Sequence, residues 1–172
     1  KLNSDLVLWR ELIERIPKEF PNAQWTASVH VDSRMDNGLS KADLQKAAKA
    51  GLVRITCGLE SGSPRMLKLM AKGIKLDRVS TFLKDAHEAG ISVRMTAIIG
   101  YPGEEVTDVN LTRQFIAQHT PYIERIMLNR FTLMPDTPVA RLLANNSAKY
   151  PEIRVQQLDV NSATLRHFNA KL

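Results

Sequence analysis

Apolar residues recur along this chain with two different periods, which predict helices and strands. Leu6, Trp9 and Ile13 recur at helical spacing and predict a first helix, which Pro17 and Pro21 should end. Capping hydroxyls, apolar stripes and glycine stops predict further helices over residues 40–51, 63–73, 79–90 and 107–118. The intervening segments carry the second period.

That second period repeats at every second residue, the pattern of strands with two unlike faces. Such segments cover residues 25–32, 53–60, 93–100 and 124–134. One face of the predicted strands is mainly apolar, while the other carries hydroxyls, arginines, a histidine and carboxylates. Burying such polar groups without partners is costly. The polar face is therefore predicted to line a wet cavity or to meet a polar ligand, and a sheet with one solvated face is the alternative.

A weak internal repeat indicates how the strands are connected. AKAGLVRITCGLESG is echoed by HEAGISVRMTAIIGYPG, and the glycines at 51 and 90 are 39 positions apart. This spacing suits a βα unit of about forty residues and predicts a parallel sheet. Four such strands are half of an eight-stranded barrel, so the fold class is α/β and the chain is predicted to be part of a barrel. Ligands then bind at the carboxyl ends of the strands.

Composition narrows the function classes. The 172 residues are 44% apolar with a formal net charge of +6. The basic residues are spread thinly without aromatic interleaving, which argues against nucleic-acid binding. We predict no membrane span and a cytoplasmic protein, since no apolar run is long enough for a bilayer or a signal peptide. Cys57 is the single cysteine, and its place on the apolar strand face predicts a small buried residue. We predict no metal ligands in this chain.

Two motifs carry a resemblance to a known family. GLESGSPRMLKLMAKGI, followed by AGISVRMTAIIGYPGE, closely resembles the core of radical S-adenosylmethionine enzymes, from about Trp25 to Leu142. The likeness is strongest to the branch with cobalamin-binding members, methylthiotransferases and oxygen-independent coproporphyrinogen oxidase relatives. It implies a (βα)6 partial TIM-type barrel that binds a 4Fe-4S cluster and S-adenosylmethionine. Such an enzyme takes an electron from a donor, cleaves S-adenosylmethionine to a 5′-deoxyadenosyl radical, and acts on a substrate that is unknown here.

The resemblance also implies roles for particular residues. Glu60 matches the position that bonds the ribose hydroxyls, Thr96 one that reaches the same sugar, and Lys72 one that faces the methionine carboxylate. The remaining implied contacts surround the adenine or follow Glu60 in its loop: Ser61, Ile98, Gly100, Pro102, Gly103 and Phe131. For Glu60 and Lys72 a purely structural role is the alternative. Glu60 could serve the helix that starts at Ser63, and Lys72 could complement a helix end.

Other polar residues have open interpretations. Arg54, Arg94 and His30 could bind substrate or neutralise anions, or could pair with Asp32 and Glu60. A structural role is favoured for each one alone. The carboxylate of Glu104 is expected to cap the following helix rather than to contact a ligand.

The family's cluster motif, C-x3-C-x2-C, and its G-G-E motif do not occur in this sequence. Without three thiolates a chain holds no such cluster, so we expect a catalytically inactive fragment of a radical S-adenosylmethionine enzyme. Residues 1–145 would be the central-to-C-terminal part of the barrel and 146–172 an extension of unclear role. An exposed sheet edge would favour dimerisation. Cobalamin binding by the parent is left open. The rivals are a non-catalytic binding or scaffold module and an RNA-modifying methylthiotransferase.

Overall fold

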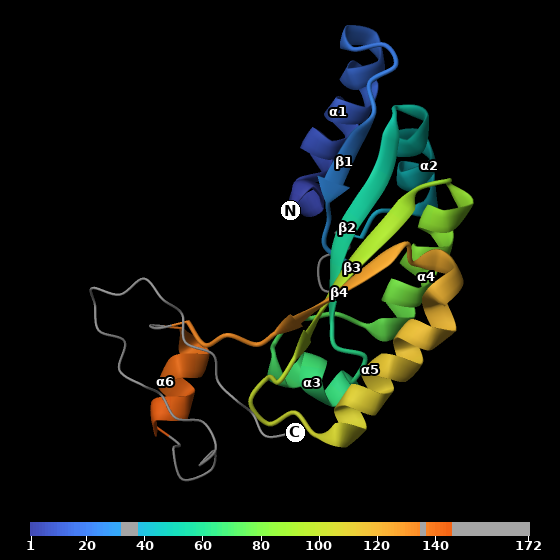
Figure 1. Ribbon diagram of the computed structural model, residues 1–172. Coiled ribbons are helices and arrows are strands. Elements are labelled where there is room, and N and C mark those ends of the chain that lie inside the picture. Colours follow the sequence, from blue (N-terminus) through green and yellow to red (C-terminus); the bar gives the residue numbers. More distant parts are fainter. Residues whose placement is uncertain (32–37, 135–136, 146–172) are drawn as a thin grey trace.

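The computed structural model describes residues 1–31, 38–134 and 137–145. They form an α/β fold with strands and helices in alternation (Figure 1). The main elements in chain order are α1 (Leu6–Glu19), β1 (Trp25–Ser28), α2 (Lys41–Lys49), β2 (Leu52–Glu60), α3 (Pro64–Leu69), α4 (Leu76–Glu88), β3 (Ser92–Ile99), α5 (Val106–His119), β4 (Arg125–Arg130) and α6 (Pro138–Asn145). Short 3-10 turns cover Leu2–Ser4 and Thr120–Tyr122.

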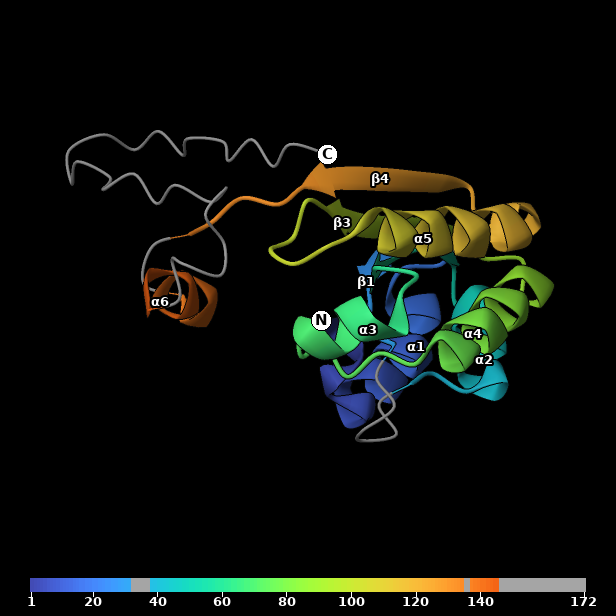
Figure 2. The same cartoon turned by 90° about the horizontal axis from the view of Figure 1, so that it is seen from below.

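The four strands form one sheet in the order β1-β2-β3-β4, and every neighbouring pair is parallel. Helices α1, α2, α4 and α5 lie on the same side of this sheet, whereas α6 lies apart from it (Figure 2). Because the strands are parallel, all their carboxyl ends meet at one edge. The predicted parallel α/β sheet is therefore confirmed, and its helix-covered and open faces are defined.

The core lies between the sheet and its helices. Fully or nearly fully buried side chains come from the strands and from the apolar stripes of α1, α2 and α4: Trp9, Leu44, Ala47, Ile55, Val79, Leu83, Ala86, Val93 and Met95. Their burial supplies most of the driving force for this layer. On the open face, the alternate residues of β2 and β3 are half-buried. The two unlike faces predicted from the period-two pattern are thus present.

Most helix signals work as predicted. Ser40 and Asp43 form a reciprocal capping box, in which the hydroxyl accepts from the Asp43 N–H and the carboxylate accepts from the Ser40 N–H. Ser63 caps α3, with Pro64 at its first position. Gly51 and Gly90 follow helices with positive φ angles, as glycine stops do.

Several predicted boundaries are wrong. Helix α1 continues through Pro17 to Glu19: the proline removes only the N–H that would bond the Ile13 carbonyl, and Phe20 N–H still bonds the Ile16 carbonyl. Helix α3 ends at Leu69 rather than at Gly73. The outer strands also end early, at Ser28 and Arg130, since an edge strand has a ladder on one side only.

Candidate functional site

The carboxyl end of β2 holds the most unusual backbone of the open face. Glu60, its last residue, has φ 62°, in the left-handed region that disfavours side chains with a Cβ. Pairing with β3 shifts register here, from Gly58↔Thr96 to Glu60↔Ala97. A Cβ on Gly58 would lie 2.7 Å from Glu60 Oε1, so the glutamate side chain lies close against this glycine. The irregular strand end therefore places the Glu60 carboxylate over Gly58, near the carboxyl end of β2.

Among the described residues, Glu60 has one cation partner, Lys72. Lys72 Nζ lies 3.4 Å from Glu60 Oε1, and the two side chains are 39% and 18% exposed. This is longer than a strong charge-assisted bond, which spans about 2.7–2.9 Å. The pair is therefore loose and within reach of solvent, and a ligand could exchange with either partner.

The loop after β3 approaches the same edge with its backbone. Gly100 and Gly103 have φ 80° and 83°, and a Cβ on Gly100 would meet nothing within 4 Å. Glu104 Oε2 accepts a bond of 2.5 Å from Gly100 N–H, and burial raises the pKa of the Glu104 carboxyl. The prediction that Glu104 caps α5 is therefore wrong: it closes its own loop, and Glu105 is the cap residue of α5.

Apolar groups border this loop. Phe131 N–H extends the β3–β4 ladder by bonding the Ile99 carbonyl at 2.8 Å. Its ring packs edge-on against Tyr101, with centroids 4.9 Å apart. Ile98 is half-buried and Pro102 is buried. The β3 exit thus combines an open glycine with aromatic and aliphatic walls.

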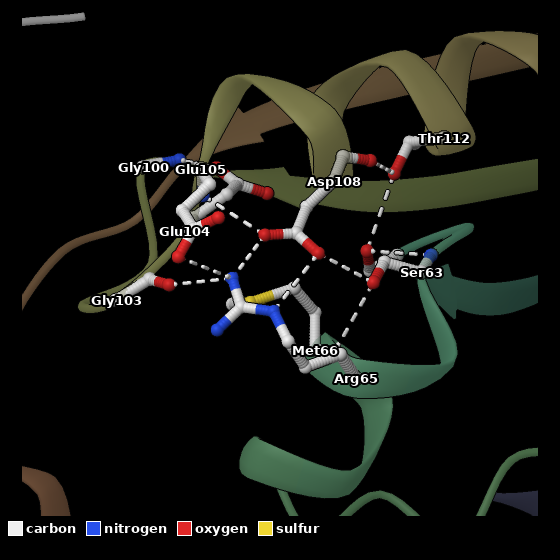
Figure 3. A network of polar contacts seen from close by, with 10 residues as sticks. Ser63, Arg65, Met66, Gly100, Gly103, Glu104, Glu105, Asp108 and Thr112 are labelled. Carbon is white, nitrogen blue, oxygen red and sulfur yellow. Dashed lines mark hydrogen bonds and ion pairs between the residues drawn. The ribbon is translucent and has the colours of Figure 1, made fainter.

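A buried carboxylate, Asp108, joins the loop after β2 to the loop after β3 (Figure 3). It accepts from Ser63 Oγ at 2.6 Å and from Glu105 N–H at 2.9 Å, and it forms an ion pair with Arg65. Arg65 also donates to the Gly103 carbonyl at 2.8 Å. Burial opposes ionisation, but the bonds from Arg65, Ser63 and Glu105 outweigh it and lower the pKa of Asp108 to about 2. We call Ser63, Arg65, Asp108 and Thr112 the loop latch.

Thr112 completes the latch one helical turn after Asp108. Its hydroxyl donates to the Asp108 carbonyl, accepts from Gly62 N–H at 2.9 Å and lies 3.2 Å from Ser61 Oγ. Ser61 is fully buried, and its hydroxyl also accepts from Ser63 N–H. Sequence analysis missed Asp108 and Thr112. The available signal was their i, i+4 spacing, which puts two polar side chains on the same face of α5.

The amino end of the open face carries a second charged group. Glu124, just before β4, accepts from Arg54 Nε at 3.1 Å and from Arg94 Nη2 at 3.0 Å, and it also contacts Ser92. The Arg94 bond leads in lowering the pKa of Glu124. Of the predicted partners, Glu60 pairs with Lys72 instead, and Asp32 lies outside the described residues. The backbone of His30 exchanges hydrogen bonds with the Asn3 side chain.

The resemblance implies an iron–sulfur cluster and S-adenosylmethionine, and the two need different side chains. Cys57 is 1% exposed, and burial raises the pKa of its thiol to about 12. In residues 1–31, 38–134 and 137–145, no three His, Cys, Asp or Glu side chains are placed to hold a metal ion. These residues therefore do not fit an iron–sulfur cluster. A polar, partly exposed edge with a carboxylate, an ammonium and an open glycine does fit S-adenosylmethionine.

Comparison with known proteins decides the family. The model of the radical SAM superfamily matches residues 2–116. The chain belongs to the radical SAM superfamily. It is 33% identical to the biotin synthase of Methylobacterium sp. (strain 4-46) over 101 residues, 59% of this chain and 30% of that protein. It is 30% identical to an uncharacterized methyltransferase of Pyrococcus horikoshii over 136 residues, 77% of this chain and 28% of that protein.

Solved structures extend this radical SAM likeness to the fold. The radical S-adenosylmethionine methyltransferase TsrM from Kitasatospora setae, with cobalamin and a [4Fe-4S] cluster bound, matches with a TM-score of 0.66 and 20% identity. The match covers 83% of this chain and 26% of TsrM. Methylthiotransferases and coproporphyrinogen III oxidase are also among the matches. The predicted superfamily and the partial-barrel fold are thereby confirmed.

The chain spans less than a third of the length of the curated relatives it matches. In the described residues, no helix is both long and apolar enough to cross a membrane. The predicted division at residue 145 stays a prediction, and 146–172 lie outside the described residues.

Proposed function

We propose that the loops after β2 and β3 bind S-adenosylmethionine, and that this chain supplies the cofactor-binding edge of a radical SAM enzyme. The observation that carries this proposal is Glu60, a carboxylate held at φ 62° on the open face with one loose cation partner. Strained residues of this kind persist where the surrounding structure fixes them, and they cluster at ligand sites. The loop latch supplies that fixation.

Glu60 and Lys72 divide the recognition of the cofactor between them. The carboxylate accepts from the two ribose hydroxyls, and the ammonium pairs with the methionine carboxylate. Because their mutual distance is 3.4 Å, each loses little when it exchanges its partner for the ligand. Thr96, the register partner of Gly58, adds a hydroxyl on the same face.

The β3 exit receives the adenine. A flat ring can approach Gly100 because nothing within 4 Å fills the space of a side chain there. Ile98 and Phe131 provide apolar contacts beside it. Pro102 and Gly103 shape the loop, and the buried Ser61 acts by positioning Glu60 through the latch.

Radical chemistry needs parts that these residues do not supply. When bound, a cluster provides the electron that cleaves the sulfonium, but a single buried thiol does not hold one. We infer that the cluster ligands belong to other parts of the enzyme and that these 172 residues alone do not cleave S-adenosylmethionine. The substrate and the electron donor are contacts of the whole enzyme.

Titration calorimetry tests the cofactor site. Glu60→Gln should weaken S-adenosylmethionine by about 10- to 100-fold, the range for losing a charge-assisted bond. It should weaken 5′-methylthioadenosine equally, because both ligands share the ribose. Lys72→Ala should weaken S-adenosylmethionine only, since 5′-methylthioadenosine has no carboxylate.

Glu124→Gln is the matched control, because Glu124 is also a carboxylate of the open face but lies at its other end. It should leave both affinities within about twofold. Unchanged binding in Glu60→Gln would remove the ribose assignment. No binding of either nucleoside by the wild-type protein would favour a non-catalytic scaffold module.

A further inference from the structure

Three arginines gather at the amino end of the open face. Arg54, Arg94 and Arg125 come from β2, β3 and β4, and we call them the arginine floor. Arg94 is the register partner of Arg125 and also of Thr56, two residues after Arg54. Register partners in a sheet project to the same side, as do residues i and i+2 of one strand. All three guanidinium groups therefore start from one face.

This floor has more positive charge than its own carboxylate can neutralise. Glu124 is shared by Arg54 and Arg94, with Ser92 as a third contact, so its oxygens are already engaged. In the described part of the chain, Arg125 has no carboxylate within ion-pair distance, and the buried Arg94 Nε has no hydrogen-bond partner. The Arg125 guanidinium is therefore the charge of this floor that no carboxylate of the described fold engages.

The surroundings of the floor indicate what kind of anion fits there. Arg94 remains 28% exposed, so its guanidinium is within reach of a ligand. On the way from the floor to the carboxyl edge the same face presents Thr96 and the 42% exposed Met127, which are register partners. Arg94 and Ile99 are five positions apart on β3, which is about 17 Å along the strand.

We propose that the arginine floor binds the carboxylate or phosphate group of an elongated substrate, whose apolar part lies along Met127 and whose reacting carbon lies at the carboxyl edge. The anion accepts from Arg94 and Arg125, and it competes with Glu124 for Arg94. The word substrate rests on the proposed function, but anion binding itself does not require S-adenosylmethionine.

Titration calorimetry at constant ionic strength tests this site with three probes that share an eight-carbon chain: octanoate, octyl phosphate and octanol. Both anions should bind and octanol should bind at least tenfold more weakly. The stronger of the two anions identifies the head group. Equal binding of all three probes, or no binding of either anion, would overturn the proposal.

Variants separate an anion site from an internal ion pair. Arg94→Gln and Arg125→Gln should each weaken the better anion about tenfold, and Arg125→Gln removes no ion pair of the described fold. Glu124→Gln should strengthen anion binding about threefold or more, because it removes the competing negative charge. Arg113→Gln, an exposed arginine of α5, is the control and should change nothing. If Glu124→Gln weakens the anion, or Arg125→Gln leaves it unchanged, the floor is structural only.

These tests are independent of the cofactor assignment. Arg125→Gln should leave the affinity for S-adenosylmethionine unchanged, and Glu60→Gln should leave octanoate binding unchanged. Failure of the anion titrations therefore leaves the cofactor site standing, and failure of the cofactor titrations leaves the anion site standing.

Discussion

Two carboxylates mark opposite ends of the open sheet face, and their environments differ in kind. Glu124, at the amino end, is engaged by two arginines and a serine. Glu60, at the carboxyl end, has a left-handed backbone and one ammonium at 3.4 Å. A carboxylate whose hydrogen bonds are satisfied internally contributes to the fold. One that is left with open acceptor positions, on a strained backbone, is available to a ligand.

The loop latch explains how the carboxyl end keeps its strain. Its buried members link the β2 exit loop to the first turn of α5 with several short bonds to one carboxylate, Asp108. The donors of these bonds are Ser63, Arg65 and the Glu105 N–H, none of which belongs to a strand of the sheet. The latch therefore stabilises the site from the helix layer and does not use the Glu60 carboxylate or the Lys72 ammonium.

The largest expected effect is at Gly62, where the β2 exit loop touches α5. A Cβ there would lie 2.5 Å from Thr112 Cα and 2.8 Å from the Leu111 carbonyl oxygen, both backbone atoms. Gly62→Ala should therefore lower the free energy of unfolding by about 3 kcal/mol and weaken S-adenosylmethionine. Urea denaturation measures the first effect. Gly38→Ala is the control, since a Cβ at Gly38 meets nothing within 4 Å; equal losses in both variants would show that the loop can yield.

Next in size is the acid response of the latch. The folded-state pKa of Asp108 is about 2, below its ordinary value of 3.8. Its stabilising effect is therefore complete above pH 3.8 and is lost as the pH falls toward 2, by about 2 kcal/mol in all. Urea denaturation at a series of pH values should show this slope. Asp108→Asn should flatten it, and an unchanged slope in that variant would assign the acid sensitivity elsewhere.

The residues at the carboxyl ends of β2 and β3 could be predicted from the sequence, because the patterns that indicate them are local. The spacing of Gly51 and Gly90, the period of β2 and β3 and the Ser63-Pro64 cap each depend on neighbours in the chain. The structure places Glu60 and Lys72 together as an ion pair. Their role toward the cofactor stays a prediction.

The rest depends on contacts between distant residues. The bonds from Ser63 and Arg65 to Asp108 span more than forty positions, and no local period indicates them. Glu124 is similar, since Arg54 lies 70 positions before it. Charge pairing between separate elements is set by how the layers dock, so a sequence with several carboxylates leaves the choice of partner open.

A smaller effect should expose the strain at Glu60. Glycine adopts a φ of 62° freely, whereas alanine does not, and neither keeps the carboxylate. Glu60→Gly should therefore be more stable than Glu60→Ala by about 1 kcal/mol, while both lose affinity for S-adenosylmethionine. Thermal and urea denaturation of the two variants check this. Equal stabilities would mean that the loop relaxes to another backbone conformation, and the contrast between the two sheet ends would lose its structural basis.

The smallest expected effect is at Glu124, at the other end of the comparison. Its carboxylate is 37% exposed, so water and salt screen its pairs with Arg54 and Arg94. Glu124→Gln should cost less stability than Asp108→Asn, and the loss should shrink when urea denaturation is repeated in 1 M salt. The Asp108→Asn loss should persist in salt, because that carboxylate is 2% exposed. A salt-independent loss at Glu124 as large as that at Asp108 would mean that the Glu124 ion pairs stabilise the fold as strongly as the buried latch does.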